Sequence, residues 1–237
     1  MKKHLMALAA ITAVGTAVLA YLFLTKQITP ARASSQAHDV DRLFSVLFAI
    51  ASFFLVLCLG GLVYSLIFFR RRKGDESDGP AMFGHAPLEV TWTLVPLAIV
   101  IVLAIIGAFV LQSVTAAPKE ELDVRVSAFQ FGWQFNYPNE GLQTNELRLP
   151  IGQPVRFTLT SRDVIHDFWV PEFRIKEDAV PGMETTLRIT PDRLGDYWAL
   201  CNELCGIGHA YMRAPVKVVT QEQYRSWIEG LKKEKGS

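Results

Sequence analysis

Three long stretches of the sequence contain no charged residue, and this feature limits the possible folds more than any other. They cover residues 5–25, 43–69 and 90–118. Each reaches or exceeds the roughly 20 residues that a helix needs to cross a bilayer, and each is apolar all round rather than on one face. We therefore predict two membrane-spanning helices at about 43–69 and 91–114, with a third apolar segment near the N-terminus.

The composition agrees with a protein that is partly embedded in a membrane. Half of the residues are hydrophobic and 20% are charged, and the mean hydropathy is +0.23. These values exclude a disordered chain and fit an ordinary single soluble domain poorly. The net charge of +1 gives no sign of nucleic-acid binding, and three cysteines are too few for a disulfide scaffold.

Basic residues indicate how the apolar segments are oriented. Lys2 and Lys3 precede the first segment, and the cluster at 70–73 follows the second. The positive-inside rule places both on the cytoplasmic side, so that residues 26–42 and everything after 118 lie on the outer side. A basic cluster also suits a lipid or nucleic-acid patch, but the end of a membrane helix explains it sufficiently.

The N-terminal segment has two interpretations. A basic start, an apolar stretch and Ala31-Arg32-Ala33 resemble a signal peptide with an A-x-A cleavage site. The apolar stretch is longer than the usual 7–15 residues, so an uncleaved anchor fits the sequence nearly as well as a signal peptide. We therefore divide the chain into a signal peptide or N-terminal anchor, a two-helix transmembrane hairpin, a soluble domain, and a helix with a charged tail, at residues 1–33, 34–118, 119–220 and 221–237.

The soluble half alternates apolar and polar residues with a period of two, which is typical of half-buried strands. The alternation covers residues 122–128, 155–160, 185–190 and, approximately, 214–219. Pro- and Gly-containing turns separate these strands, so a β-sandwich or barrel is predicted. Thr220 and Gln223 form a capping box before apolar residues at helical spacing, which predicts a C-terminal helix.

One short loop contains a group of soft metal ligands. Cys201, Cys205, His209 and Met212 lie within twelve residues. Thiolate, imidazole and thioether together favour copper over zinc, because methionine is a poor zinc ligand. A disulfide between the cysteines leaves the histidine and methionine unexplained, and a zinc site leaves the methionine unused; both remain alternatives.

Two cysteines allow more than a mononuclear blue-copper site, which uses a single thiolate. Two thiolates can bridge two metals, and a second metal needs a further histidine. His166 is the only other histidine in the soluble half. It is therefore a candidate ligand, although a lone histidine after a strand can also be a surface residue with its hydrogen bonds satisfied.

Taken together, these motifs resemble subunit II of haem–copper cytochrome c oxidases from about residue 38 onward. The matching motifs are C-x-E-x-C-G-x-x-H-x-x-M at 201–212, D-V-x-H at 163–166, D-A-V-P-G at 178–182, E-x-x-W-T-x-x-P at 89–96 and the aromatic tract at 129–137. The resemblance implies that residues 119–220 form a cupredoxin-like domain with a dinuclear copper centre, called CuA, after two transmembrane helices.

The resemblance also implies a role for each ligand. Cys201 and Cys205 would bridge both coppers. His166 and Met212 would complete one copper, and His209 with the backbone carbonyl of Glu203 would complete the other. The Glu203 carboxylate would reach a magnesium ion shared with subunit I.

Three further residues receive roles from the family. Glu89 matches the carboxylate at the cytoplasmic mouth of a proton path, although an acidic residue that complements the helix dipole is the plain alternative. The family's aromatic tract typically has two tryptophans, and the first is the residue through which electrons are proposed to enter. Here the first is replaced by Phe131, and only Trp133 remains.

The function implied is that of a subunit in a respiratory cytochrome c oxidase, not catalytic alone. It would accept electrons from a soluble c-type cytochrome or a small blue-copper protein and pass them to haem in subunit I, where oxygen reduction to water is coupled to proton pumping. Subunits I and III, the donor and the lipid bilayer are the partners expected, without nucleic acid. The chain would be a multi-pass protein of a bacterial-type energy-transducing membrane, with its copper domain on the periplasmic or lumenal side.

Other functions fit the sequence less well. A membrane-tethered copper carrier would need one exchangeable copper, a quinol oxidase subunit lacks the ligands, and nitrous-oxide reductase lacks the two-helix anchor. Residues 119–219 contain 14 acidic and 11 basic residues, a net charge of −3. We therefore expect only modest electrostatic steering of the donor, with apolar contacts from Phe131, Trp133 and Phe168.

Overall fold

The computed structural model describes residues 2–25, 29–71, 73–79, 81 and 83–235. Arg72 of the basic cluster and the last two residues of the predicted charged tail lie outside this set. The chain divides into two compact units, each with parts from distant sequence positions: Met1–Ile28 with Arg42–Phe109, and Thr29–Asp41 with Val110–Ser237. The first unit contains the apolar segments, and the second contains all the strands.

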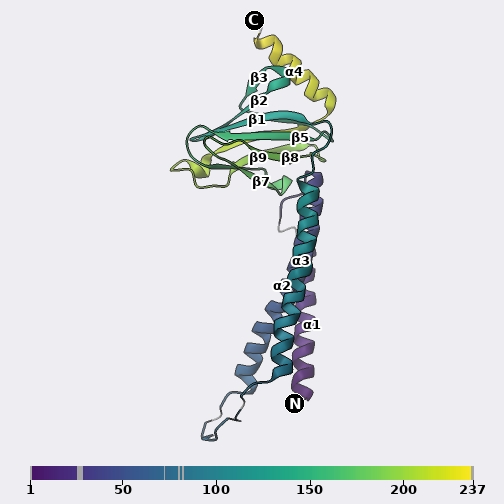
Figure 1. The fold of residues 1–237 in the computed structure, drawn as a ribbon, viewed down its shortest axis with the longest axis vertical. Helices are drawn as coiled ribbons and strands as arrows, with labels where there is room; N and C mark the ends of the chain where they lie inside the picture. Colours follow the sequence, from purple (N-terminus) through teal and green to yellow (C-terminus); the bar gives the residue numbers. More distant parts are fainter. Residues whose placement is uncertain (1, 26–28, 72, 80, 82, 236–237) are drawn as a thin grey trace. The chain divides into compact units, whose positions relative to one another are not determined.

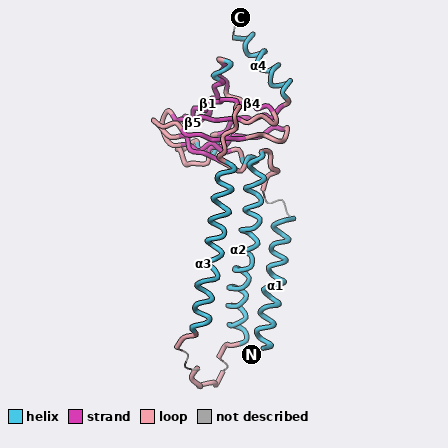
Figure 2. The backbone as a smooth tube through the Cα atoms, turned by 45° about the vertical axis from the view of Figure 1, so that its right-hand side comes forward, coloured by secondary structure: helices cyan, strands magenta, loops and turns pink. Residues whose placement is uncertain are grey.

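Three helices occupy the N-terminal half: α1 (Lys2–Thr25), α2 (Ser35–Phe68) and α3 (Ala86–Val114) (Figure 2). All three are long and apolar enough to cross a membrane. Very few of their residues are buried within the chain. Apolar helices with so little internal burial need lipid or other membrane subunits around them, because water would not tolerate this much exposed apolar surface.

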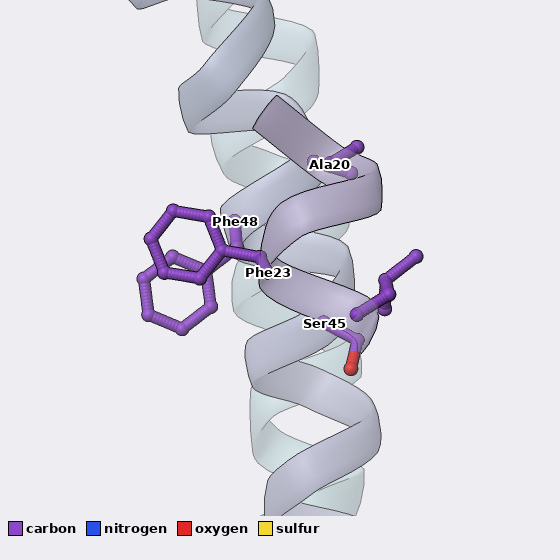
Figure 3. Close-up of a pocket in the computed structure, with 6 residues that line it drawn as sticks. Ala20, Phe23, Ser45 and Phe48 are labelled. Carbon is purple, nitrogen blue, oxygen red and sulfur yellow. The ribbon is translucent and has the colours of Figure 1, made fainter. Parts of the chain in front are cut away.

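Helix α1 packs against α2 through specific side-chain contacts. The His4 Nδ1 atom lies 2.7 Å from the Tyr64 hydroxyl oxygen. Phe23 and Phe48 stack with their ring centroids 4.3 Å apart, beside a small hollow that Ala20 and Ser45 also line (Figure 3). These contacts extend over most of the length of α1.

The second unit contains two five-stranded sheets (Figure 1). The first has the order β3-β2-β1-β5-β8 and the second β4-β10-β9-β6-β7. The strands are β1 (Leu122–Phe129), β2 (Gly132–Tyr137), β3 (Leu142–Thr144), β4 (Leu147–Pro150), β5 (Val155–Ser161), β6 (His166–Trp169), β7 (Lys176–Ala179), β8 (Thr185–Ile189), β9 (Gly195–Cys201) and β10 (Arg213–Val219).

The core lies where the inward side chains of the two sheets meet. Phe168 of β6 contacts Phe135 of β2 and Phe157 of β5, at centroid distances of 6.2 and 5.5 Å. All three rings are almost fully buried. Strand β5 alternates between buried and half-buried residues along its whole length, as its sequence period predicts. The prediction of apolar N-terminal helices followed by a β-sandwich and a C-terminal helix is confirmed.

Two sequence details have a clear outcome. The aromatic tract at 129–137 is not one strand, because β1 ends at Phe129 and β2 begins at Gly132, with a turn between them. The predicted capping box is present: the Gln223 N–H donates to the Thr220 Oγ1 atom at 3.2 Å, and the Thr220 N–H donates to the Gln223 side chain at 3.0 Å. Helix α4 (Gln221–Lys235) follows it.

Residues 29–41 belong to the β-unit rather than to the helical unit. Ser34 forms a β-bridge with Pro191, and the Ala33 N–H donates to the Glu172 carbonyl oxygen at 2.9 Å. The Arg174 guanidinium donates to the Asp41 carboxylate at 2.7 Å. This segment is therefore hydrogen-bonded to the sandwich at several points.

Candidate metal centre

The predicted ligands come from three places in the second sheet and its loops. His166 is the first residue of β6 and Cys201 is the last residue of β9. These two strands pair with Phe168 opposite Cys201, which brings the histidine beside the loop. His209 begins the short 3-10 helix His209–Tyr211, and Met212 directly precedes β10. The ends of three neighbouring strands thus surround one point.

The ligand atoms converge at that point. The Cys201 and Cys205 sulfur atoms are 3.8 Å apart. The Cys201 sulfur is 3.7 Å from the His166 Nδ1 atom and 3.2 Å from the Glu203 carbonyl oxygen. The Cys205 sulfur is 3.7 Å from both the His209 Nδ1 atom and the Met212 sulfur. The four other atoms that the resemblance assigns to copper therefore all lie around the two thiols.

The sulfur spacing distinguishes the alternatives for the two cysteines. A disulfide bond is about 2.05 Å long, whereas these sulfurs are 3.8 Å apart and both cysteines are free thiols. Two thiolates on one metal, each at about 2.3 Å and with a near-tetrahedral angle, would lie about 3.8 Å apart. The pair is therefore spaced for metal binding.

The donor set fits copper better than zinc. The Met212 thioether is buried, 2% exposed, and its sulfur faces Cys205. His166 is fully buried and forms with both cysteines a group whose ligand atoms all lie within 4.8 Å of one another. A thioether at the centre of such a group contributes little to zinc and is a good ligand for copper.

The two buried thiols favour the binding of a cation at the site. Burial raises the pKa of the Cys205 thiol, and the neighbouring Cys201 thiol adds to this effect, so that the pKa reaches about 11. Two adjacent buried thiolates would repel each other in a region of low dielectric constant. A bound metal ion removes this penalty, because it favours the deprotonated sulfur.

Asp163 holds the His166 ring from the opposite side. Its Oδ1 atom lies 2.8 Å from the His166 Nε2 atom, and with Nε2 so occupied, Nδ1 is left facing Cys201. Burial alone would raise the pKa of Asp163, but hydrogen bonds from His166 and from the Gln130 and Val164 backbone N–H groups outweigh it and hold the pKa at about 2. Metal-binding histidines commonly have such a carboxylate partner. The D-V-x-H motif contains Asp163, but residue type and spacing alone do not reveal this contact.

Glu203, which lies within the ligand loop, is exposed. Near it, Asp167 of β6 is buried and forms an ion pair with Lys176 of β7. Burial raises the pKa of Asp167 against the opposing effect of this hydrogen bond. Sequence reasoning did not find this pair, because Asp167 gave no motif signal of its own.

Glu89 lies in the first turn of α3, which belongs to the helical unit. It is far in sequence from the proposed metal ligands. Its Oε1 atom accepts a hydrogen bond from the His85 N–H at 2.8 Å. The His85 Nδ1 atom in turn accepts a hydrogen bond from the Leu88 N–H at 3.2 Å. The carboxylate thus satisfies a helix N-terminus, as the helix-dipole alternative expects. This contact does not test the proton-path role of Glu89, which stays a prediction.

The aromatic residues differ sharply in exposure. Phe131 is 38% exposed, whereas Trp133 and Phe168 are 2% and 1% exposed. The expectation that Trp133 and Phe168 contact a donor at the surface is therefore wrong, because both rings fill the space between the sheets. Trp133 lies instead edge-on to His166, with ring centroids 6.2 Å apart.

Comparison with known proteins adds two family matches. The cytochrome c oxidase subunit II transmembrane domain matches residues 23–110, and the periplasmic domain of the same subunit matches residues 140–219. Cytochrome c oxidase subunit 2 of Thermostichus vulcanus is 33% identical, over 84% of this chain and 77% of that protein. The Synechocystis protein of the same name is also 33% identical, over 85% and 75%.

One solved structure is also similar to part of the chain. The crystal structure of the periplasmic domain of cytochrome oxidase subunit II of Bradyrhizobium japonicum is 30% identical, with a TM-score of 0.47, and covers 50% of this chain and 99% of that one. With matches across both the membrane and the soluble parts, the chain belongs to the cytochrome c oxidase subunit II family and is a subunit of a haem–copper oxidase.

Proposed function

We propose that this chain is the subunit through which electrons enter the oxidase. It accepts them from a soluble c-type cytochrome or a small blue-copper protein and passes them to haem in subunit I, for the reduction of oxygen coupled to proton pumping. The observation that carries this proposal is the convergence of four further donor atoms around two thiols 3.8 Å apart, in a chain of this family. Such a set suits a dinuclear copper centre.

Each ligand residue has a distinct task in this proposal. Cys201 and Cys205 would hold both coppers through their thiolates, and His166 with Met212, and His209 with the Glu203 carbonyl, would supply the remaining ligands. The bound pair would take up and release one electron at a time. Asp163 fixes the orientation of the His166 ring, and the buried positions of Met212 and His166 keep water away. Strands on both sides hold the ligands still, which suits a site that must change little when it is reduced.

The test of this function is a metal analysis of the purified complex combined with electron paramagnetic resonance. Two coppers per chain that share one unpaired electron, seen as a seven-line pattern, are expected. A single exchangeable copper with a four-line pattern would instead indicate a copper carrier.

The proposal places the β-unit on the outer side of the membrane, opposite the basic cluster that follows α2. The Glu203 carboxylate would bind a magnesium ion shared with subunit I, and subunit III would complete the complex. We also propose the division of the chain at residues 33, 118 and 220, with the copper domain spanning 119–220.

Donor docking is proposed to depend more on apolar contacts than on charge. The ligand loop exposes large apolar side chains: Leu204 is 78%, Ile207 99% and Tyr211 84% exposed, and Phe131 is exposed as well. The net charge of the domain is small. We expect the bimolecular rate of electron transfer from the donor to fall by less than about tenfold between low and physiological salt, because electrostatic steering is weak.

The contribution of the loop can be separated from that of apolar surface in general. Ile207→Ser should slow the bimolecular rate severalfold. Leu194→Ser, at an exposed site before the opposite end of β9, should leave it unchanged. A decline of several decades with salt, or equal effects of the two variants, would contradict apolar docking.

Glu89→Gln is expected to slow oxygen reduction without altering the copper spectrum. Glutamine keeps an oxygen that can accept the His85 N–H but cannot carry a proton, so we expect turnover to fall at least about tenfold. The control is Thr91→Ala, which changes a neighbouring exposed side chain. Normal turnover of the glutamine variant would leave Glu89 with its helix-capping role alone.

We propose that residues 1–33 stay attached as an anchor. Cleavage after Ala33 would remove α1 with its contacts to α2, and the Ala33 hydrogen bond to Glu172. The mass of the chain in the purified complex should therefore include α1. Ala31→Leu, an exposed change that would block an A-x-A cleavage, should alter this mass only by the substitution itself. A mature chain that starts at Ser34 would contradict the anchor.

A further inference from the structure

The turn between β1 and β2 contacts both parts of the candidate metal centre. We propose that Gln130 in this turn is a positioning residue, which holds the segment that bears His166 and the loop that bears the two cysteines at a fixed separation. This inference rests on the proposed copper site and adds a residue that binds no metal itself.

Gln130 forms one hydrogen bond to each ligand-bearing segment. Its side-chain Nε2–H donates to the Cys205 carbonyl oxygen at 2.5 Å. Its backbone N–H donates to the Asp163 Oδ2 atom at 2.7 Å. Cys205 and Asp163 are far apart in sequence, and this single residue joins them. The distance between the two segments is thus set by the length of one glutamine.

The bond to Asp163 continues to the histidine. Asp163 uses its other oxygen to bond the His166 ring, and its Oδ1 atom also accepts the Val164 N–H at 2.7 Å. With both oxygens engaged, the carboxylate has one orientation. The backbone of Gln130 therefore helps to fix the plane of the imidazole, which leaves Nδ1 toward Cys201.

The bond to Cys205 is reinforced by the next residue. The Phe131 ring lies over Gly206 and Gly208, so closely that a Cβ at Gly206 would lie 3.2 Å from the ring and 2.9 Å from the Gln130 Nε2 atom, and one at Gly208 would collide with the ring. The loop between Cys205 and His209 thus packs closely against the turn. Only residues without side chains allow this approach.

Gln130 contacts the ligand loop, which belongs to neither sheet. Of the proposed ligands, only His166 and Cys201 lie in strands; Glu203, Cys205, His209 and Met212 lie in the loop between β9 and β10. In this loop, the backbone carbonyl of Cys205 has the Gln130 amide as a partner. Partners behind the ligands of a metal typically change its affinity by about 10- to 100-fold. Loss of the Gln130 amide should therefore loosen the loop more than it weakens the fold.

The experiment compares three variants of the full chain in its purified complex. Gln130→Met keeps the length of the side chain but removes the donor, Gln130→Ala removes both, and Gln143→Ala is a matched control on the exposed face of β3. The measurements are the rate of copper loss to an excess of chelator and the melting temperature of each protein.

Both Gln130 variants should lose copper about tenfold faster than the wild type, as expected for one lost hydrogen bond and at the lower end of the range above, while Gln143→Ala matches the wild type. If Gln130→Met loses copper at the wild-type rate, the side chain only fills space, and the inference is overturned. So would unchanged rates in both variants. If Gln130→Ala unfolds, the methionine variant alone decides. A wild-type complex that holds no copper would instead refute the proposed function.

Discussion

Replacing Cys205 by serine is expected to remove copper from the chain, so that the copper content falls from about two per chain to near zero. A hydroxyl is a hard, weakly acidic donor, and it cannot replace a thiolate shared between two metals. In the structure, the Cys205 sulfur lies within 3.8 Å of three other donors, those of Cys201, His209 and Met212. Cys201→Ser should have the same effect. The measurement is copper per chain in the purified complex.

Cys58→Ser is the matched control for this experiment. Cys58 is the third free cysteine, exposed on α2, and its replacement makes the same chemical change away from the site. It should leave both the copper content and the electron-transfer rate unchanged. A Cys205→Ser protein that keeps two coppers and transfers electrons at the normal rate would show that this thiol does not bridge.

The second large effect is the pH dependence of the copper affinity. Because burial and the neighbouring Cys201 thiol raise the pKa of Cys205 to about 11, this thiol is protonated in the metal-free chain at neutral pH. Copper binds the thiolate, so binding must release the proton. Below the raised pKa, the apparent affinity should therefore rise at least about tenfold per pH unit, or about a hundredfold from pH 7 to pH 9.

This dependence can be measured by competition with a chelator at known free copper, together with the protons released in a weak buffer. Met212→Leu serves as the control, since a thioether carries no proton. It should change the affinity or the reduction potential but leave the pH slope as it was. An affinity that does not change between pH 7 and pH 9 would mean that Cys205 is already ionised in the metal-free protein, contrary to its burial.

Much of this architecture follows from periodicity alone. Apolar runs predict the three helices, and alternation predicts β1, β5 and β8 closely, because each of these strands has one face toward the core. The capping box at Thr220 marks the start of α4 for the same kind of local reason. These features depend on residues near one another in sequence.

Features that depend on pairing between distant segments were not predictable in the same way. Strand β6 is four residues long with three buried in succession, so no alternation marks it. The aromatic tract is continuous in sequence, yet it turns at Gln130 and Phe131. Trp133 and Phe131 are similar in type, but only the register of β1 with β2 shows which ring points into the core. The hydrogen bonds of Gln130 likewise join three separate segments.

The pairing of β6 with β9 has a consequence for the order in which the protein matures. His166 and Cys201 meet only when these strands are side by side, and the sandwich around them closes through parallel pairs, β1 with β5 and β4 with β10. Contacts of this kind form late, because a long stretch of chain must first be brought together. The ligand residues therefore come together only in the folded domain, so we expect a metal that needs all of them to bind after folding rather than to direct it.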